Sequence, residues 1–320
     1  MNSFSFELKK EVAQIECFGD ESISELSGLI KTSGEITKNS QGERIVVFTE
    51  IDEVAQKIEK YVKNIYGVYV EKTFVEKPFS NSNRIEIILP REITRQVLID
   101  TEIAVLDEDK YLEFQYGISK YLVQEEETAR AFLRGAFEGA FSCNINLSGI
   151  NKETSTTGYH AEFVFSNEIF AQDFCFLLAD FDIISKMTPR KNSFVVYVKG
   201  LDMVSDLFAL VGANRGVLAL QNESAYRSIR NTVNRQNNCA TGNLTKTIDA
   251  SVREIEAINF INEAIGLENL DAPLQQVAYL RLANPEESLD ELVKLSTTQI
   301  SKSGLYHRLK KIEKIASDLK

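Results

Sequence analysis

The residues best suited to bind a polyanion lie together near the C-terminus, in the stretch 301–316. Successive helical residues turn by about 100°, so a helix here would have one apolar face, made of Leu305, Leu309, Ile312 and Ala316. The opposite face would be polar and cationic, with Ser303, His307, Lys310, Lys311 and Lys314 on it and Tyr306 and Arg308 beside it. Such cations bind phosphates, and hydroxyl or imidazole groups can also contact base edges. The alternative is a solvated lysine face on a generic three-helix bundle.

Two predicted helices precede this stretch and would position it. The first spans 273–283 and stops at Asn284-Pro285, because proline cannot continue a helix. The second starts at Ser288, which forms an S-x-x-E capping box with Glu291. A short polar turn follows at 296–299. This layout is typical of a helix-turn-helix, whose second helix enters the major groove of DNA.

Residue types that usually carry catalysis or hold metals are scarce. The only histidines are His160 and His307, and the four cysteines are widely spaced with no CxxC pair. This excludes a structural zinc site of the usual spacing and makes Ser-His-Asp schemes improbable. We therefore predict no catalytic residue, no metal and no cofactor. His160 lies in a predicted strand and is expected to be packed. Free thiols indicate a reduced, cytosolic protein.

Composition places the chain among globular proteins of two or three domains, given 320 residues and 43% hydrophobic residues. The start of the sequence shows no signal peptide, and no apolar run approaches the roughly 18 residues of a membrane span. Charge is divided unevenly. Residues 214–320 hold 14 Lys and Arg against 13 Asp and Glu, whereas the net charge of the whole chain is −11. A polyanion is therefore expected to bind near the C-terminus.

The segment 221–246 is polar and rich in asparagine, with Arg227, Arg230 and Arg235 interleaved. We interpret it as a linker or a partly ordered arm before a helix near 246–264. The arginines offer a second nucleic-acid contact, because cations and amides can reach phosphates beside a docked helix.

An internal repeat fills the first two thirds of the chain. The stretches Leu26-Ser-Gly-Leu-Ile30 and Leu133-Arg-Gly-Ala-Phe137 both predict a helix with a central glycine. The pattern that follows each is a strand pair, a helix, a second strand pair and a helix. A helical glycine costs about 1 kcal/mol relative to alanine, which is tolerable where two backbones approach closely. The sequence thus predicts that these two helices cross at a pseudo-two-fold axis.

These observations define the expected organisation of an α+β protein. The first half of the repeat spans 1–110 and the second spans 111–220. A polar linker and helix at 221–270 and an all-α helix-turn-helix domain at 271–320 follow.

The repeat resembles the LAGLIDADG homing-endonuclease fold, in which two αββαββ halves form a saddle over DNA. That resemblance implies one metal-binding carboxylate on each motif helix, since hard divalent cations need oxygen ligands. The matching positions here are Ser33 and Ala140, which cannot hold a metal. Glu35 and Glu138 are close in sequence, but they would approach from the wrong direction, because each residue of a helix turns by about 100°. The scaffold is therefore expected to be catalytically degenerate.

A DNA-binding saddle would also need cations along its open face. Five basic residues in the second strand pair of each repeat are candidates for lining one face of the saddle: Lys72, Lys77, Lys186, Arg190 and Lys191. The acidic balance of this region argues against phosphate binding there. We therefore favour a structural, partner-binding or ligand-binding role for the N-terminal part.

Three further blocks of the sequence are distinctive: Arg134-Gly-Ala-Phe137, Asn231-Thr-Val-Asn-Arg235 and the stretch from Ile300 to Leu309. Through these blocks the whole chain resembles the WhiA family of bacterial regulators, which are linked to sporulation and cell division. The family combines a degenerate LAGLIDADG-like domain with a C-terminal helix-turn-helix. The resemblance implies a non-enzymatic regulator of transcription that binds double-stranded DNA. It adds Ser301, Lys302 and Tyr306 to the expected DNA contacts.

The resemblance also implies a cytoplasmic, nucleoid-associated protein with a role in division, chromosome segregation or sporulation. Two alternatives stay open. The acidic N-terminal part is a candidate scaffold or sensor for a protein or small ligand. A residual metal-dependent nuclease that uses Glu35 and Glu138 is the less favoured reading.

Overall fold

The computed structural model describes residues 3–40, 42–76, 83–145 and 158–319. Contacts divide the chain into two compact units, an N-terminal unit of Met1–Tyr226 and a C-terminal unit of Arg227–Lys320. The N-terminal unit has two hydrophobic cores and the C-terminal unit has its own.

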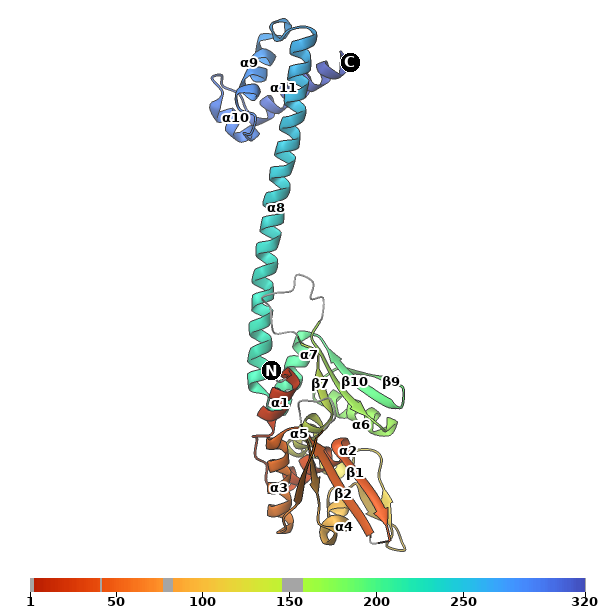
Figure 1. Cartoon of the computed structure of the whole chain (residues 1–320). Coiled ribbons are helices and arrows are strands. Elements are labelled where there is room, and N and C mark those ends of the chain that lie inside the picture. Colours follow the sequence, from red (N-terminus) through yellow and green to blue (C-terminus); the bar gives the residue numbers. More distant parts are fainter. Residues whose placement is uncertain (1–2, 41, 77–82, 146–157, 320) are drawn as a thin grey trace. The chain divides into compact units, whose positions relative to one another are not determined.

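The N-terminal unit contains the predicted duplication (Figure 1). The first repeat consists of α2 (Asp20–Ser33), β1 (Gly34–Asn39), β2 (Gly42–Thr49), α3 (Asp52–Tyr66), β3 (Glu71–Glu76), β4 (Asn83–Ile88) and α4 (Arg91–Asp100). The second consists of α5 (Glu126–Ala140), β7 (Phe141–Cys143), β8 (His160–Phe165), α6 (Glu168–Ala179), β9 (Ser185–Arg190), β10 (Ser193–Lys199) and α7 (Leu201–Val211). Both sheets are antiparallel and have equivalent orders, β1-β2-β4-β3 and β7-β8-β10-β9.

Shorter elements surround the repeats. Helix α1 (Phe4–Val12) precedes the first, and the two repeats are joined through β5 (Ala104–Leu106), β6 (Leu112–Phe114) and the short helix η1 (Lys120–Val123). Helix α4 ends at Asp100, and the strand β5 follows it. The helix cannot continue because Glu102 takes a left-handed backbone conformation with φ of 51°.

The two motif helices α2 and α5 pack through their glycines, as predicted. A Cβ atom on Gly28 would lie 2.4 Å from the carbonyl oxygen of Phe132. A Cβ atom on Gly135 would lie 2.0 Å from the carbonyl oxygen of Glu25. Only glycine permits this approach, so each helix presents bare backbone to the other at the crossing.

The segment that we interpreted as a linker or partly ordered arm is helical throughout. Helix α8 runs from Asn214 to Ala264 without a break. Leu220 is buried in the core of the N-terminal unit, and Ile258 and Ile261 are buried in the core of the C-terminal unit. No proline interrupts the chain between 190 and 272. Asparagine costs only a few tenths of a kcal/mol more than average helix formers, so the anchored helix tolerates the polar stretch.

The C-terminal unit is all helical. Its elements are the last part of α8, the short helix η2 (Leu267–Asn269), α9 (Ala272–Ala283), α10 (Leu289–Leu295) and α11 (Lys302–Asp318). The three predicted C-terminal helices are therefore present, with ends within two residues of those expected. Among the described residues of the chain, no helix is both long enough and apolar enough to cross a membrane.

Candidate nucleic-acid interface

Serine caps define the two helices of the helix-turn-helix. The Ser288 hydroxyl accepts a hydrogen bond from the Glu291 backbone N–H at 3.3 Å, and the Ser301 hydroxyl accepts one from the Gly304 N–H at 3.1 Å. The predicted cap at Ser288 is therefore confirmed. The reciprocal half of the box is not, because the Glu291 carboxylate pairs with Lys294 at 2.7 Å.

The apolar face of α11 forms one side of the C-terminal core. Each of its four predicted members is at most 3% exposed, and they pack in one cluster with residues of α8 and α9: Leu305, Leu309, Ile312 and Ala316. This burial fixes the rotation of α11 about its axis. The predicted polar face must therefore point away from the core.

Most of the predicted contact residues lie on that outer face. Seven of the nine are exposed: Ser301, Lys302, Ser303, Tyr306, His307, Lys311 and Lys314. Arg308 and Lys310 are half-buried at the edges of the face. The outer face thus combines hydroxyl, imidazole and ammonium groups on the second helix of the motif.

Several of these cations already have acidic neighbours. Lys302 pairs with Asp290 and Lys310 pairs with Glu313, while the Lys311 amine lies 3.6 Å from an Asp271 oxygen. Ion pairs at the protein surface contribute only about 0–1 kcal/mol, so a phosphate can replace the carboxylate at small cost.

A buried ion pair holds the helices behind this face. The Arg281 guanidinium lies 2.8 Å from the Glu254 carboxylate, and both side chains are at most 4% exposed. Arg281 also donates a hydrogen bond to the Glu287 carbonyl at 2.7 Å. Burial raises the pKa of the Glu254 carboxyl, and the neighbouring Arg281 charge opposes that rise. Arg281 thereby joins α8, α9 and the loop that leads into α10.

The predicted second contact lies on α8. Arg230 and Arg235 are exposed and Arg227 is half-buried. With 3.6 residues per turn, the three fall within an arc of about 140° on the helix. Whether this arc binds nucleic acid stays a prediction.

The two positions that the resemblance matched to metal-binding carboxylates hold Ser33 and Ala140. Ser33 and Ala140 are the last residues of α2 and α5, and the Ser33 hydroxyl donates to the Leu29 carbonyl at 2.8 Å. Glu35 is exposed on β1, whereas Glu138 is buried and pairs with Lys57. Across the described ranges, no three His, Cys, Asp or Glu residues are grouped as they would be around a metal ion.

The basic residues that were considered for an open face of the two sheets do not all lie on one. Lys72 pairs in register with the buried Ile87 and forms a salt bridge with Glu59 of α3, so it lies on the helix-covered face. Lys72 is therefore not available to line the open face, and the sequence could not show this because a strand residue's face depends on the register. Lys77 lies outside the described residues.

The other three candidates belong to the second hairpin of the second repeat. Lys186 is exposed and pairs in register with Tyr197, and Arg190 and Lys191 are exposed at the end of the hairpin. His160 stacks on Tyr197 with ring centroids 5.5 Å apart, which agrees with the packed role expected for it.

Comparisons with known proteins cover nearly the whole chain. Family models match in three consecutive parts: the WhiA N-terminal LAGLIDADG-like domain at 20–104, the WhiA LAGLIDADG-like domain at 129–230, and the WhiA C-terminal HTH domain at 233–316. A relative from Clostridium botulinum, named "Probable cell division protein WhiA", is 37% identical over 320 residues and is covered, like this chain, over 99% of its length. The chain belongs to the WhiA family.

Other members of the WhiA family are similar to this chain in sequence or in fold. A relative of the same name from Thermoanaerobacter pseudethanolicus is 37% identical over 99% of this chain and 98% of its own length. The crystal structure of full-length DUF199/WhiA from Thermotoga maritima matches with a TM-score of 0.58 at 24% identity, over 99% of both chains. That of the N-terminal LAGLIDADG domain of DUF199/WhiA matches 66% of this chain and 91% of its own, with a TM-score of 0.50 at 19% identity. These structures support the fold.

In this WhiA-family chain, charged side chains are buried where α3 packs against the motif helices α2 and α5. The Lys57 amine of α3 donates to the carboxylates of Glu25 at 2.6 Å and Glu138 at 2.8 Å, and to the Val12 carbonyl at 3.2 Å. All three ammonium protons are therefore used. The Tyr61 hydroxyl donates to Glu25 at 2.7 Å. We call Glu25, Lys57, Tyr61 and Glu138 the buried ionic cluster.

The α1–α2 connection reaches the cluster through Cys17 and Arg134. The Arg134 guanidinium lies 2.7 Å from the Cys17 sulfur and 3.6 Å from a Glu25 oxygen. Burial raises the pKa of the Cys17 thiol to about 12, so this cysteine stays protonated at neutral pH. Such a thiol is a poor nucleophile. Cys17, Cys143 and Cys175 are free thiols, as the sequence predicted.

Glu138→Gln is expected to change how stability depends on pH. Burial raises the Glu138 pKa to about 7, against 4.5 in an ordinary glutamate. Between these pH values the unfolded chain releases a proton that the folded chain keeps, so the stability contribution of Glu138 falls as pH rises through this window. The variant lacks this loss. It should gain on the parent by up to about 3 kcal/mol from pH 4.5 to pH 7.

Urea denaturation of both proteins across this pH range measures the effect. Glu16→Gln serves as the control, because Glu16 forms an exposed pair with Lys60. Parallel pH profiles for the parent and Glu138→Gln would show that Glu138 titrates normally.

Proposed function

We propose that this protein is a non-enzymatic regulator that binds double-stranded DNA through α11. The observation that carries the proposal is the division of α11 into two faces. Leu305, Leu309 and Ile312 are fully in the core, whereas Ser303, His307 and Lys314 face solvent on the second helix of a helix-turn-helix. Such a face fits the major groove, with Ser303 and His307 near base edges and the flanking lysines on phosphates.

The proposed absence of enzymatic activity rests on Ser33 and Ala140. Both stand where the LAGLIDADG scaffold needs a metal-binding carboxylate. The nearby Glu138 is held by Lys57 at 2.8 Å and is not available at the helix ends. Plasmid DNA incubated with the full chain and Mg²⁺ or Mn²⁺ should stay intact. Cleavage that is lost in Glu138→Gln would contradict the proposal.

The cellular role is inferred from relatives. Two relatives that are 37% identical carry the name "Probable cell division protein WhiA". We infer a role in cell division or the associated chromosome segregation or sporulation, exerted in the cytoplasm on the nucleoid. The regulated process follows from the genes bound, which chromatin immunoprecipitation with the full chain identifies.

DNA binding is tested by gel-shift titration of the full chain at 50 and 200 mM salt. Because each neutralised phosphate releases counterions, affinity should fall steeply with salt. Binding that is absent at low salt, or that ignores salt, would contradict the proposed interface.

Lys311→Glu combined with Lys314→Glu should weaken DNA binding by about 10- to 100-fold, similarly for all sequences. Both side chains are exposed on α11, so folding should be intact. The slope of log affinity against log salt should become shallower by about 2, since two phosphate contacts are lost.

The matched control is Lys110→Glu with Lys120→Glu, which makes the same charge change at exposed positions of the N-terminal unit. If both double variants lose affinity equally, net charge explains the effect and α11 is not the contact face.

A further inference from the structure

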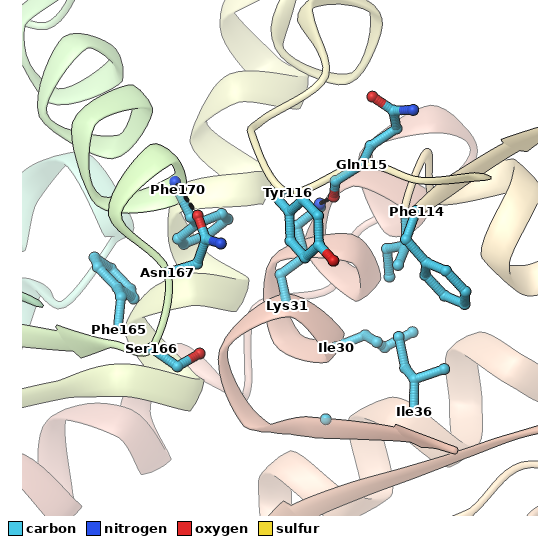
Figure 2. A pocket seen from close by; sticks show the side chains of 12 residues that line it. Ile30, Lys31, Ile36, Phe114, Gln115, Tyr116, Phe165, Ser166, Asn167 and Phe170 are labelled. Atoms are coloured by element: carbon cyan, nitrogen blue, oxygen red, sulfur yellow. Dashed lines mark hydrogen bonds between the residues drawn. The ribbon is translucent and has the colours of Figure 1, made fainter. Parts of the chain in front are cut away.

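A pocket of about 300 Å³ lies at the seam of the two repeats (Figure 2). Three segments and Ile103 line it; the segments are the end of α2 with the start of β1, the connection at 114–116, and the junction of β8 with α6. Figure 2 shows Phe165, Ser166, Asn167 and Phe170 on one side and Ile30, Ile36 and Phe114 on the other, with Lys31 and Tyr116 between them. The walls are therefore mainly apolar and aromatic.

Lys31 supplies a cation inside this apolar lining. Its amine donates to the Gln115 carbonyl at 2.7 Å and lies 6.0 Å from the centre of the Phe170 ring. Burial lowers the Lys31 pKa to about 8, and the charge of Asp173 opposes that change. An ammonium group has three protons to donate, so the bond to Gln115 leaves capacity for an anion.

The position in the second repeat that corresponds to Lys31 is Glu138, and its surroundings can be compared with the pocket. Lys31 and Glu138 are both the third-last residue of a motif helix. Around Glu138 the groove is filled by α1, whose Lys9 amine donates to the Gly139 carbonyl at 3.4 Å. Burial lowers the pKa of Lys9 to about 8, and the carboxylates of Glu138 and Glu50 oppose that change. There, α1 brings a cation on an apolar stem to the buried Glu138 carboxylate.

Next to Lys31, no helix among the described residues takes the place that α1 takes next to Glu138. The motif offset of 107 residues relates α1 to the segment 111–119. This segment is not helical: it forms the short strand β6 and then runs along the pocket as Gln115 and Tyr116. An extended chain fills less space than a helix. The charge at this end is also inverted, because lysine replaces glutamate.

We propose that the pocket binds a small aromatic acid, with its anionic group on Lys31 and its ring among Phe114, Phe165 and Phe170. The volume fits a molecule of one or two rings. Asn167 supplies a polar group at the opposite wall, because its side-chain oxygen accepts from the Phe170 N–H at 3.1 Å and its amide NH₂ still has protons to donate. The acid can be a carboxylate or a phosphate, such as that of a nucleotide.

The first experiment uses 1-anilinonaphthalene-8-sulfonate, an aromatic anion whose fluorescence rises in apolar surroundings. The full-length protein should bind the probe, and Lys31→Met should bind it at least tenfold more weakly. Binding to the parent should decline above about pH 8, where Lys31 loses its proton, and Lys31→Met should show no such decline.

Two further variants keep the test specific. Lys38→Met removes an exposed lysine from β1 and should bind the probe as the parent does. Ser166→Phe adds a ring at the exposed Ser166 and should block the pocket without disturbing the core. Equal affinity in the parent, Lys31→Met and Ser166→Phe would overturn the proposal.

Competition identifies the acid. Displacement of the probe by indole-3-acetate alone identifies a carboxylate ligand, and displacement by AMP alone identifies a phosphate. Displacement by both supports the shared chemistry of ring and anion. Displacement by neither at millimolar concentration would overturn the proposal. None of these outcomes depends on whether the protein binds DNA.

Discussion

Lys57→Met is expected to destabilise the N-terminal unit by about 3–5 kcal/mol, because it removes one partner of a buried ion pair. The Lys57 side chain is 4% exposed, and the carboxylates of Glu25 and Glu138 that it contacts are 0% exposed. Methionine keeps the length and apolar character of the stem, so the loss reports on the charge. The two carboxylates would then lie buried without the amine that donates to both.

Urea denaturation and thermal melts of the full chain measure this loss. For a unit of this size, the melting temperature should drop by about 10 °C. Lys60→Met is the matched control on the same helix, since Lys60 forms an exposed pair with Glu16 and its removal should cost less than about 1 kcal/mol. Adding Glu138→Gln to Lys57→Met should restore part of the stability. If Lys57→Met behaves as Lys60→Met does, the cluster does not stabilise the fold.

The cluster also favours one pairing of the two repeats. Lys57 and Asp173 are each the sixth residue of the helix between the hairpins, α3 or α6. Between the two repeats, Lys57 pairs with Glu138, and the negative charge of Asp173 opposes the lowering of the Lys31 pKa that burial causes. If either repeat paired with a second copy of itself, Lys31 would face Lys57, or Glu138 would face Asp173. Like charges in a poorly solvated seam are unfavourable, so this inversion favours the pairing of unlike repeats within one chain.

Local patterns were sufficient to predict the repeat and the helix-turn-helix. The strict spacing from Leu305 to Ala316 leaves one rotation for α11, and its burial confirms that rotation. Gly28 and Gly135 marked the helix crossing because no other residue permits that backbone distance. Each of these signals depends on residues that are close in sequence.

Features that depend on contacts between distant residues could not be predicted. Glu25 and Lys57 are 32 residues apart and looked like ordinary surface charges in their helices. The only sequence signal was that Lys57 lies on the buried stripe of α3, between Val54 and Tyr61. The face of Lys72 depended on strand register, and the helical state of 221–246 depended on packing at the two ends of α8.

Gly135→Ala is the second change expected to have a large effect, about 3 kcal/mol or more of lost stability. An added Cβ atom would lie 2.0 Å from the carbonyl oxygen of Glu25 and 2.9 Å from the amide nitrogen of Leu29. Both are backbone atoms of α2, so no side chain can turn away to make room. The two motif helices would have to separate, and the interlocked contacts around Gly28 would be lost with them.

Gly242→Ala is the matched control, because it makes the same change within a helix where nothing lies within 4 Å of the added Cβ atom. Alanine is intrinsically better than glycine in a helix by about 1 kcal/mol, so this variant should be neutral or more stable. The opposite signs of the two changes separate steric contact from helix propensity. Thermal melts of both full-length variants decide the matter, and equal stabilisation by both would mean that α2 and α5 do not approach at Gly135.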